Sequence, residues 1–163
     1  MNPRDALQLT IQMGEFVGLA YINDLSDEDL MRRAAPGINH INWQLGHLIA
    51  SEHEMLNGSL PGSMPPLPQG FAERYAKDKA ASDNPADFAS KAELLRVYRE
   101  QREAMLTALG EQSDEALDKV SPEAFRSYAP TLGAVFALQG SHWLMHCGQW
   151  AVVRRQLGRP PLF

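Results

Sequence analysis

The chain of 163 residues contains a single cysteine, Cys147, so no disulfide can form within it. An isolated cysteine is typical of proteins from reducing compartments, and we expect a cytoplasmic location. No apolar run is long enough to span a membrane, and the first residues lack the apolar core of a secretion signal. We therefore expect no membrane partner.

Basic residues are in the minority. Lys and Arg number 15 against 20 Asp and Glu, which gives a formal net charge of -5. Because a nucleic-acid-binding surface must neutralise phosphates with basic side chains, we expect no nucleic-acid partner. The hydrophobic and charged shares, 44% and 21%, are those of a folded globular protein, and the length predicts one domain over residues 1–163.

Hydrophobic residues recur at helical spacing in four long segments. In the first segment, Gly14 and Gly18 lie on the same face as Leu7 and Ile11, and they permit close packing of a neighbour. We predict long helices over residues 2–23, 39–56, 90–110 and 131–158, with short capped turns at 25–30 and 113–117. The second helix should stop at Asn57-Gly58. The charged residues of the third are predicted mainly on its solvated faces: Arg96, Arg99, Glu100, Arg102 and Glu103.

A connection rich in proline and glycine separates the second and third helices, from residue 58 to about residue 88. Within it, residues 71–75 can form one helical turn. A connection of this length is either functional, as a lid or pocket wall, or a crossover that spans the length of the fold. Four long helices with one such connection predict an all-α four-helix bundle, a fold that builds metal sites from facing helices.

Polar residues form a stripe on two of the predicted helices. On the second helix the stripe lies between apolar residues and is expected to face a cavity: His40, Trp43, Gln44, His47, Ser51 and Glu54. On the fourth helix a similar stripe carries two histidines four residues apart: Val135, Gln139, His142, His146, Gln149 and Val153. Residues four apart lie on one helix face, so the two imidazoles can reach one divalent ion.

The motifs Gly46-His47-Leu48, Ser141-His142, His146 and Gly148-Gln149 together resemble the DinB superfamily of DinB/YfiT-like metalloproteins. The turn at 25–30, the long second connection and the ending at 157–161 add to the resemblance. It implies one divalent metal ion held by His47, His142 and His146, with zinc or nickel expected first and iron or manganese as alternatives. It also implies a four-helix bundle that forms homodimers.

Three neutral imidazoles leave at least one coordination position open, as in catalytic metal sites. Each metal-binding histidine usually donates its second N–H to an oxygen, and the candidate acceptors are Gln44, Ser51, Gln139 and Gln149. Any single histidine is more simply explained as a hydrogen-bonded residue without metal; it is the set of three that favours a metal site.

His40 is expected at the mouth of the pocket, and His53 is expected to be exposed, because it lies off the polar stripe. Cys147 is rotated by roughly 100° from His146, so we expect neither a ligand nor a nucleophile there. The three tryptophans are expected in the core: Trp43, Trp143 and Trp150.

The resemblance suggests a function, because relatives in this superfamily include thiol-dependent S-transferases that use bacillithiol and a mycothiol-dependent isomerase. The first hypothesis is a metal-dependent transferase that joins a low-molecular-weight thiol to a small-molecule substrate, or a related hydrolase. The second is a non-catalytic dimeric bundle that binds a small molecule or metal in stress response. A metal-free helical adaptor is the third.

Overall fold

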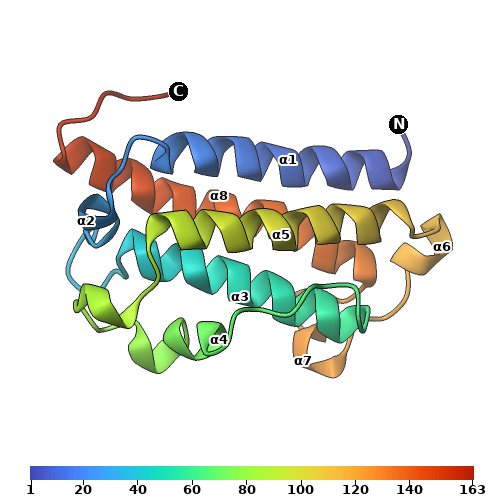
Figure 1. Cartoon of the computed structure of the whole chain (residues 1–163). Helices are drawn as coiled ribbons and strands as arrows, with labels where there is room; N and C mark the ends of the chain where they lie inside the picture. The colour runs from blue at the N-terminus through green and yellow to red at the C-terminus, as the bar shows by residue number, and fades with distance from the viewer.

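A computed structural model describes residues 1–163 and shows an all-helical protein without β-strands (Figure 1). The predicted all-α class is confirmed. The long helices are α1 (Pro3–Ile22), α3 (Ile41–Ser59), α5 (Lys91–Gly110) and α8 (Leu132–Gln156). The short ones are α2 (Asp27–Leu30), α4 (Phe71–Arg74), α6 (Asp114–Leu117) and α7 (Glu123–Arg126), with 3-10 turns at Lys77–Lys79 and Pro85–Asp87. None of the helices combines the length and hydropathy that crossing a bilayer requires.

The helix starts follow from capping side chains. The Asn2 side chain accepts a hydrogen bond from the Asp5 N–H at the start of α1, and Thr131 does the same for Ala134 in α8. Helix α3 departs from its predicted bounds at both ends. It begins after His40, which is its N-cap, and it continues through the predicted stop to Ser59, with Gly58 in helical form beside the Phe125 ring.

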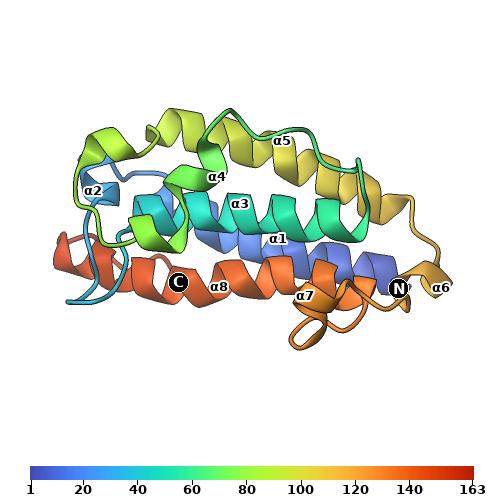
Figure 2. The same cartoon turned by 90° about the horizontal axis from the view of Figure 1, so that it is seen from below.

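The four long helices lie side by side, and each contacts two others (Figures 1 and 2). Helix α1 packs on α8 and α5, and α3 also packs on α5 and α8. The closest approach is between α1 and α8. A Cβ atom at Gly14 would lie 2.6 Å from the Gly140 carbonyl oxygen, so the two backbones meet where neither carries a side chain. The close packing predicted for the α1 glycines is confirmed.

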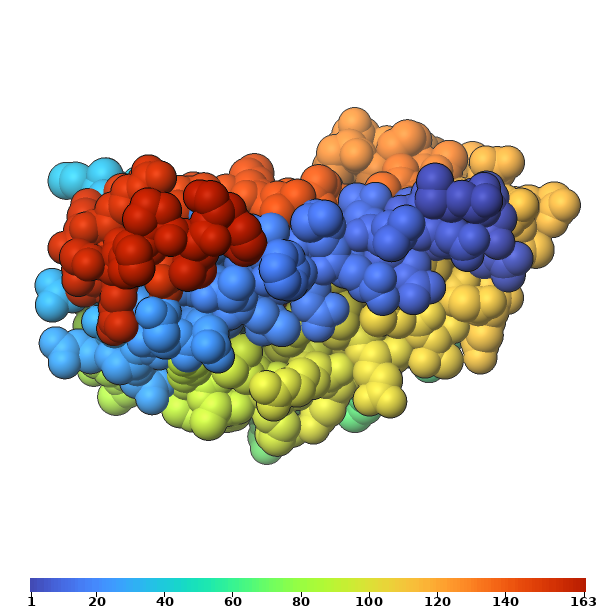
Figure 3. Space-filling model, turned by 90° about the horizontal axis from the view of Figure 1, so that it is seen from above, coloured from blue at the N-terminus to red at the C-terminus, as the bar shows by residue number.

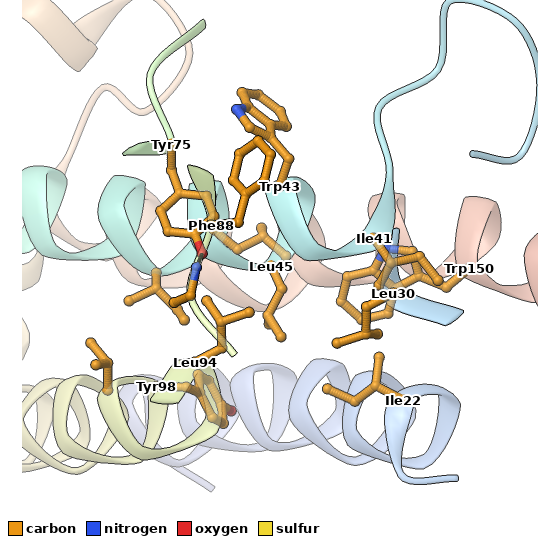
Figure 4. Close-up of a cluster of buried hydrophobic side chains, with 14 of the residues drawn as sticks. Ile22, Leu30, Ile41, Trp43, Leu45, Tyr75, Phe88, Leu94, Tyr98 and Trp150 are labelled. Atoms are coloured by element: carbon orange, nitrogen blue, oxygen red, sulfur yellow. Dashed lines mark hydrogen bonds between the residues drawn. The ribbon is translucent and has the colours of Figure 1, made fainter. Parts of the chain in front are cut away.

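The crossover, residues 60–90, runs back along α3 and covers one of its faces (Figure 2). Tyr75 holds the crossover against α3 by hydrogen bonds. The Tyr75 hydroxyl donates to Asn42 Oδ1 at 3.2 Å and accepts from the Ala89 N–H at 2.9 Å, while Asn42 Nδ2 donates to the Ala89 carbonyl. The Tyr75 ring packs beside Phe88 and lies over Gly46, where a Cβ would come within 2.2 Å of it (Figure 4). The middle and the C-terminal end of the crossover are therefore held to α3.

A buried ion pair joins α3 to α5. Arg102 donates to Glu52 Oε2 at 2.7 Å, and the two side chains are 3% and 1% exposed. The Arg102 guanidinium also lies over the rings of Tyr98 and Trp143. Burial raises the pKa of Glu52, and the Arg102 charge opposes that rise. The prediction that Arg102 faces solvent was wrong.

Candidate metal centre

The three predicted ligands come together in the structure. His47 lies in the middle of α3, and His142 and His146 lie one turn apart on the facing side of α8. One ring nitrogen from each can be chosen so that all lie within 4.8 Å of one another, and the group can hold a metal ion. The nitrogens of a tetrahedral zinc site are about 3.3 Å apart, so small side-chain rotations close the group on one ion.

The hydrogen bonds of Gln44 determine which ring nitrogen of His146 is unprotonated. Gln44 Nε2 donates to the Asn39 carbonyl and to Gln149 Oε1, so its other amide atom is the acceptor. Gln44 Oε1 lies 3.0 Å from His146 Nδ1 and also accepts from Trp150 Nε1 at 2.8 Å. His146 Nδ1 must therefore carry the proton, and Nε2 carries the lone pair.

That lone pair has no partner in the protein. His146 Nε2 is fully buried and makes no hydrogen bond. A buried nitrogen without a partner is costly, and a bound metal ion removes the cost. The donor set and this orphaned atom both fit a divalent cation.

Electrostatics keep the group in its neutral, metal-binding form. Burial, and then the charge of the neighbouring His47, lower the pKa of His142 to about 4. Burial is also the main cause of the lowered pKa of His146, which is about 4; the charges of His142 and His47 contribute to the lowering. Burial, and then the charge of Lys77, lower the pKa of His47. The rings are therefore unprotonated near neutral pH, as metal ligation requires.

Trp43 of α3, which is hydrogen-bonded to the crossover, packs against the His47 ring. The Trp43 indole stacks on the His47 imidazole, with centroids 4.9 Å apart and planes 5° from parallel. Trp43 Nε1 donates to the Ala76 carbonyl of the crossover at 3.2 Å. Trp43 is buried as predicted, and so are Trp143 and Trp150.

A cavity of about 610 Å³ lies beside His47, between α3 and the crossover. The crossover is thus part of a pocket wall, one of the two roles expected for it. Helix α3 contributes His47, Ala50, Ser51, His53, Glu54, Asn57 and Gly58 to the lining, and the crossover contributes Leu67, Ala72, Tyr75, Ala76 and Lys77. His142 and His146 do not line the cavity.

Two histidines lie elsewhere than expected. His40 is not at the pocket mouth: it is fully buried, and its Nδ1 accepts from the Trp43 N–H at 3.0 Å as the N-cap of α3. Burial and the Arg33 charge lower its pKa to about 4. His53 is not exposed; it is half-buried, lines the cavity and bonds to Gln101. Their roles depend on the helix start and on the crossover, neither of which periodicity reveals.

Of the four predicted acceptors for ligand N–H groups, Gln44 is confirmed. Gln149 accepts a hydrogen bond from Gln44 and makes no bond to the three histidines. Gln139 donates to Val135 of its own helix, and Ser51 approaches the Met55 sulfur. Cys147 lies outside the histidine cluster, is buried, and has its pKa raised to about 12 by that burial. The sequence pattern did not identify Tyr75 and Asn42, which hold the cavity wall.

The helices and the site together define an all-helical protein whose three-histidine group can hold a metal ion. The sequence profile of the DinB superfamily, a metal-associated family, matches residues 18–150, a range that includes all three histidines. The chain belongs to the DinB superfamily. No curated protein matches it.

Proposed function

We propose that the protein is a metalloenzyme in which a single-domain four-helix bundle of α1, α3, α5 and α8 binds one divalent ion through His47, His142 and His146. The observation that carries the proposal is the buried, unpartnered Nε2 of His146 beside two further imidazoles. Zinc or nickel is proposed first, on the family resemblance, with iron or manganese as the alternative; imidazole donors alone suit zinc, nickel and iron alike.

The proposed reaction is transfer of a low-molecular-weight thiol to a small electrophile, with a related hydrolysis as the variant. When bound, a divalent ion on three imidazoles supplies Lewis acidity, which favours the deprotonated form of a thiol or of water. The protein orients the ion through Gln44 and His146, and it admits the substrate to the cavity beside His47. Lys77, which lines the same cavity, favours a negatively charged group there.

A non-catalytic bundle that binds a metal or small molecule in stress response is the second candidate. Metal storage needs the three histidines but no adjoining space, so the cavity beside His47 favours the enzyme over storage. A protein that only binds a small molecule would use the same cavity, and turnover is the test between the two.

We also propose that the protein forms a homodimer through α1 and α8. Exposed apolar side chains form a stripe along α1, at Leu9, Met13 and Phe16, and Met145 of α8 is exposed as well. Helix α1 lies along one face of the molecule, with the C-terminal segment beside one end of it (Figure 3). Light scattering after size-exclusion chromatography tests this: a dimer that Met13→Glu dissociates supports it, and a monomeric wild type contradicts it.

Elemental analysis of protein purified without a histidine tag tests the metal site. We expect close to one metal ion per chain, lost in His47→Ala and in His146→Ala and retained in His53→Ala as the matched control. Equal metal content in all three variants would show that the assignment is wrong.

Turnover then separates the two candidates. Loss of 1-chloro-2,4-dinitrobenzene in the presence of a thiol, abolished by His142→Ala, supports the enzyme. Full metal content without turnover across a broad panel of thiols and electrophiles supports the binding protein.

A further inference from the structure

The buried amide of Gln101 determines the proton position on His53. Gln101 is 1% exposed and lies between His53 on α3 and the crossover. Its Nε2 donates to the Pro65 carbonyl at 2.9 Å. The reverse orientation would place two oxygen atoms against each other, so Gln101 Oε1 must face His53 Nδ1, 3.0 Å away. An amide oxygen only accepts, and His53 Nδ1 therefore carries the proton.

The other nitrogen of His53 is then a hydrogen-bond acceptor toward the cavity. His53 lines the cavity, and its Nε2 is neither bonded within the protein nor among the fully buried unpartnered atoms. The arrangement repeats that of Gln44 and His146, in which a glutamine oxygen also holds the proton on Nδ1. The difference is that the lone pair of His146 lies in the metal cluster, whereas that of His53 faces open space.

The cavity has two chemically different ends. Lys77, whose charge acts on His47, makes the end beside the metal cluster positive. His53 and Glu54 lie six and seven residues further along α3, about 9 and 10.5 Å along the helix axis. They present a lone pair and a carboxylate, both hydrogen-bond acceptors. A substrate that fills the cavity meets acceptors at the end far from His47.

We propose that His53 Nε2 and the Glu54 carboxylate form a specificity site that binds a protonated amine on the substrate, while the reacting group lies at the His47 end. An ammonium group has three donors and one positive charge, which suit a nitrogen lone pair and a carboxylate. The inference rests on the proposed function, because the metal centre defines which end of the substrate reacts.

Binding of matched thiols to the zinc-loaded protein tests the proposal. The probes are 6-amino-1-hexanethiol, 6-mercapto-1-hexanol and 6-mercaptohexanoate, whose chains are equal in length and whose ends differ in charge. Isothermal titration calorimetry should show the amine binding about tenfold or more tightly than the carboxylate, as expected for a charge-assisted hydrogen bond. In His53→Phe and in Glu54→Gln this ratio should fall to within about threefold, whereas Glu123→Gln, outside the cavity, should keep the wild-type ratio. Equal affinity for the amine and the carboxylate in the wild type would overturn the proposal.

Two further readouts separate this inference from the proposed function. Nitrogen NMR of the imidazoles should show the Nδ1–H form of His53, with loss of that preference in Gln101→Leu; an Nε2–H form would overturn the inference whatever the enzyme does. If none of the thiols binds, the thiol chemistry is wrong, and hexylamine titrated against hexanoate tests the acceptor site alone. Preference for hexylamine that disappears in Glu54→Gln supports the site, and no preference refutes it.

Discussion

Replacing Gln44 tests the metal centre without touching a ligand. Gln44→Met keeps nearly the same volume and removes the oxygen that holds His146 and Trp150. Loss of such an outer hydrogen bond weakens metal binding by about 10- to 100-fold, because the imidazole loses its fixed tautomer and some of its basicity. The same change leaves two buried N–H donors without acceptors, at a cost of about 1–3 kcal/mol each in unfolding free energy.

Zinc affinity is measured by competition with a chromophoric chelator, and stability by urea unfolding with the metal removed. We expect Gln44→Met to bind zinc 10- to 100-fold more weakly, by about 1.4–2.7 kcal/mol, in a protein that remains helical by circular dichroism.

Gln44→Glu is the matched control for this experiment. The carboxylate still accepts from His146 Nδ1, so zinc affinity should stay at or above that of the wild type. Its stability should fall, because the donors to the Asn39 carbonyl and Gln149 Oε1 are gone. Unchanged zinc affinity in a folded Gln44→Met protein would refute the reasoning, since the glutamine would then have no influence on the ligand.

Three further predictions concern folding stability. Gly14→Ala should lower the unfolding free energy in urea by about 1–3 kcal/mol, because the new methyl group meets the Gly140 carbonyl. Glu52→Leu should lower it by about 3–5 kcal/mol, because the Arg102 charge is left buried without a partner. The third follows from His40, whose pKa is about 4 in the folded protein and 6.5 when free. Between these values the unfolded chain binds a proton that the folded one excludes, so stability should fall as pH drops from about 6.5 to about 4. In metal-free protein, His40→Asn, which keeps an N-cap, should reduce this slope, and the remainder comes from His47, His142 and His146, whose pKa values are also lowered.

Each of these expectations has a result that contradicts it. A Gly14→Ala protein as stable as the wild type would mean that α1 can move away from α8 at no cost. A loss below about 1 kcal/mol in Glu52→Leu would mean that Arg102 finds another partner or water. An unchanged pH slope in His40→Asn would assign the proton uptake to other groups.

The long helices could be predicted because their signals are local. Apolar spacing and capping residues such as Thr131 act within a few positions of the helix they define. The His142 and His146 pair is local in the same sense, since one helical turn joins them. His47 entered the predicted site through the family resemblance and its place on a polar stripe, and the structure brings it to the pair.

Two of the wrong predictions concern residues whose surroundings are distant in the sequence. Arg102 was assigned to solvent because charged residues usually are, but its partner Glu52 lies 50 positions away on another helix. His53 was expected to be exposed because it leaves the polar stripe, yet Gln101 and the crossover cover it. Helical periodicity describes one helix at a time and contains no information on which helix packs against it.

The placement of the histidines makes metal affinity a measure of tertiary structure. His47 and His142 are 95 positions apart (142 minus 47), whereas His142 and His146 belong to one helix. A partly folded state that keeps its helices but lacks fixed packing, as a molten globule does, retains the pair and loses the third imidazole. Circular dichroism would record such a state as nearly native, while zinc affinity would report that α3 and α8 had separated.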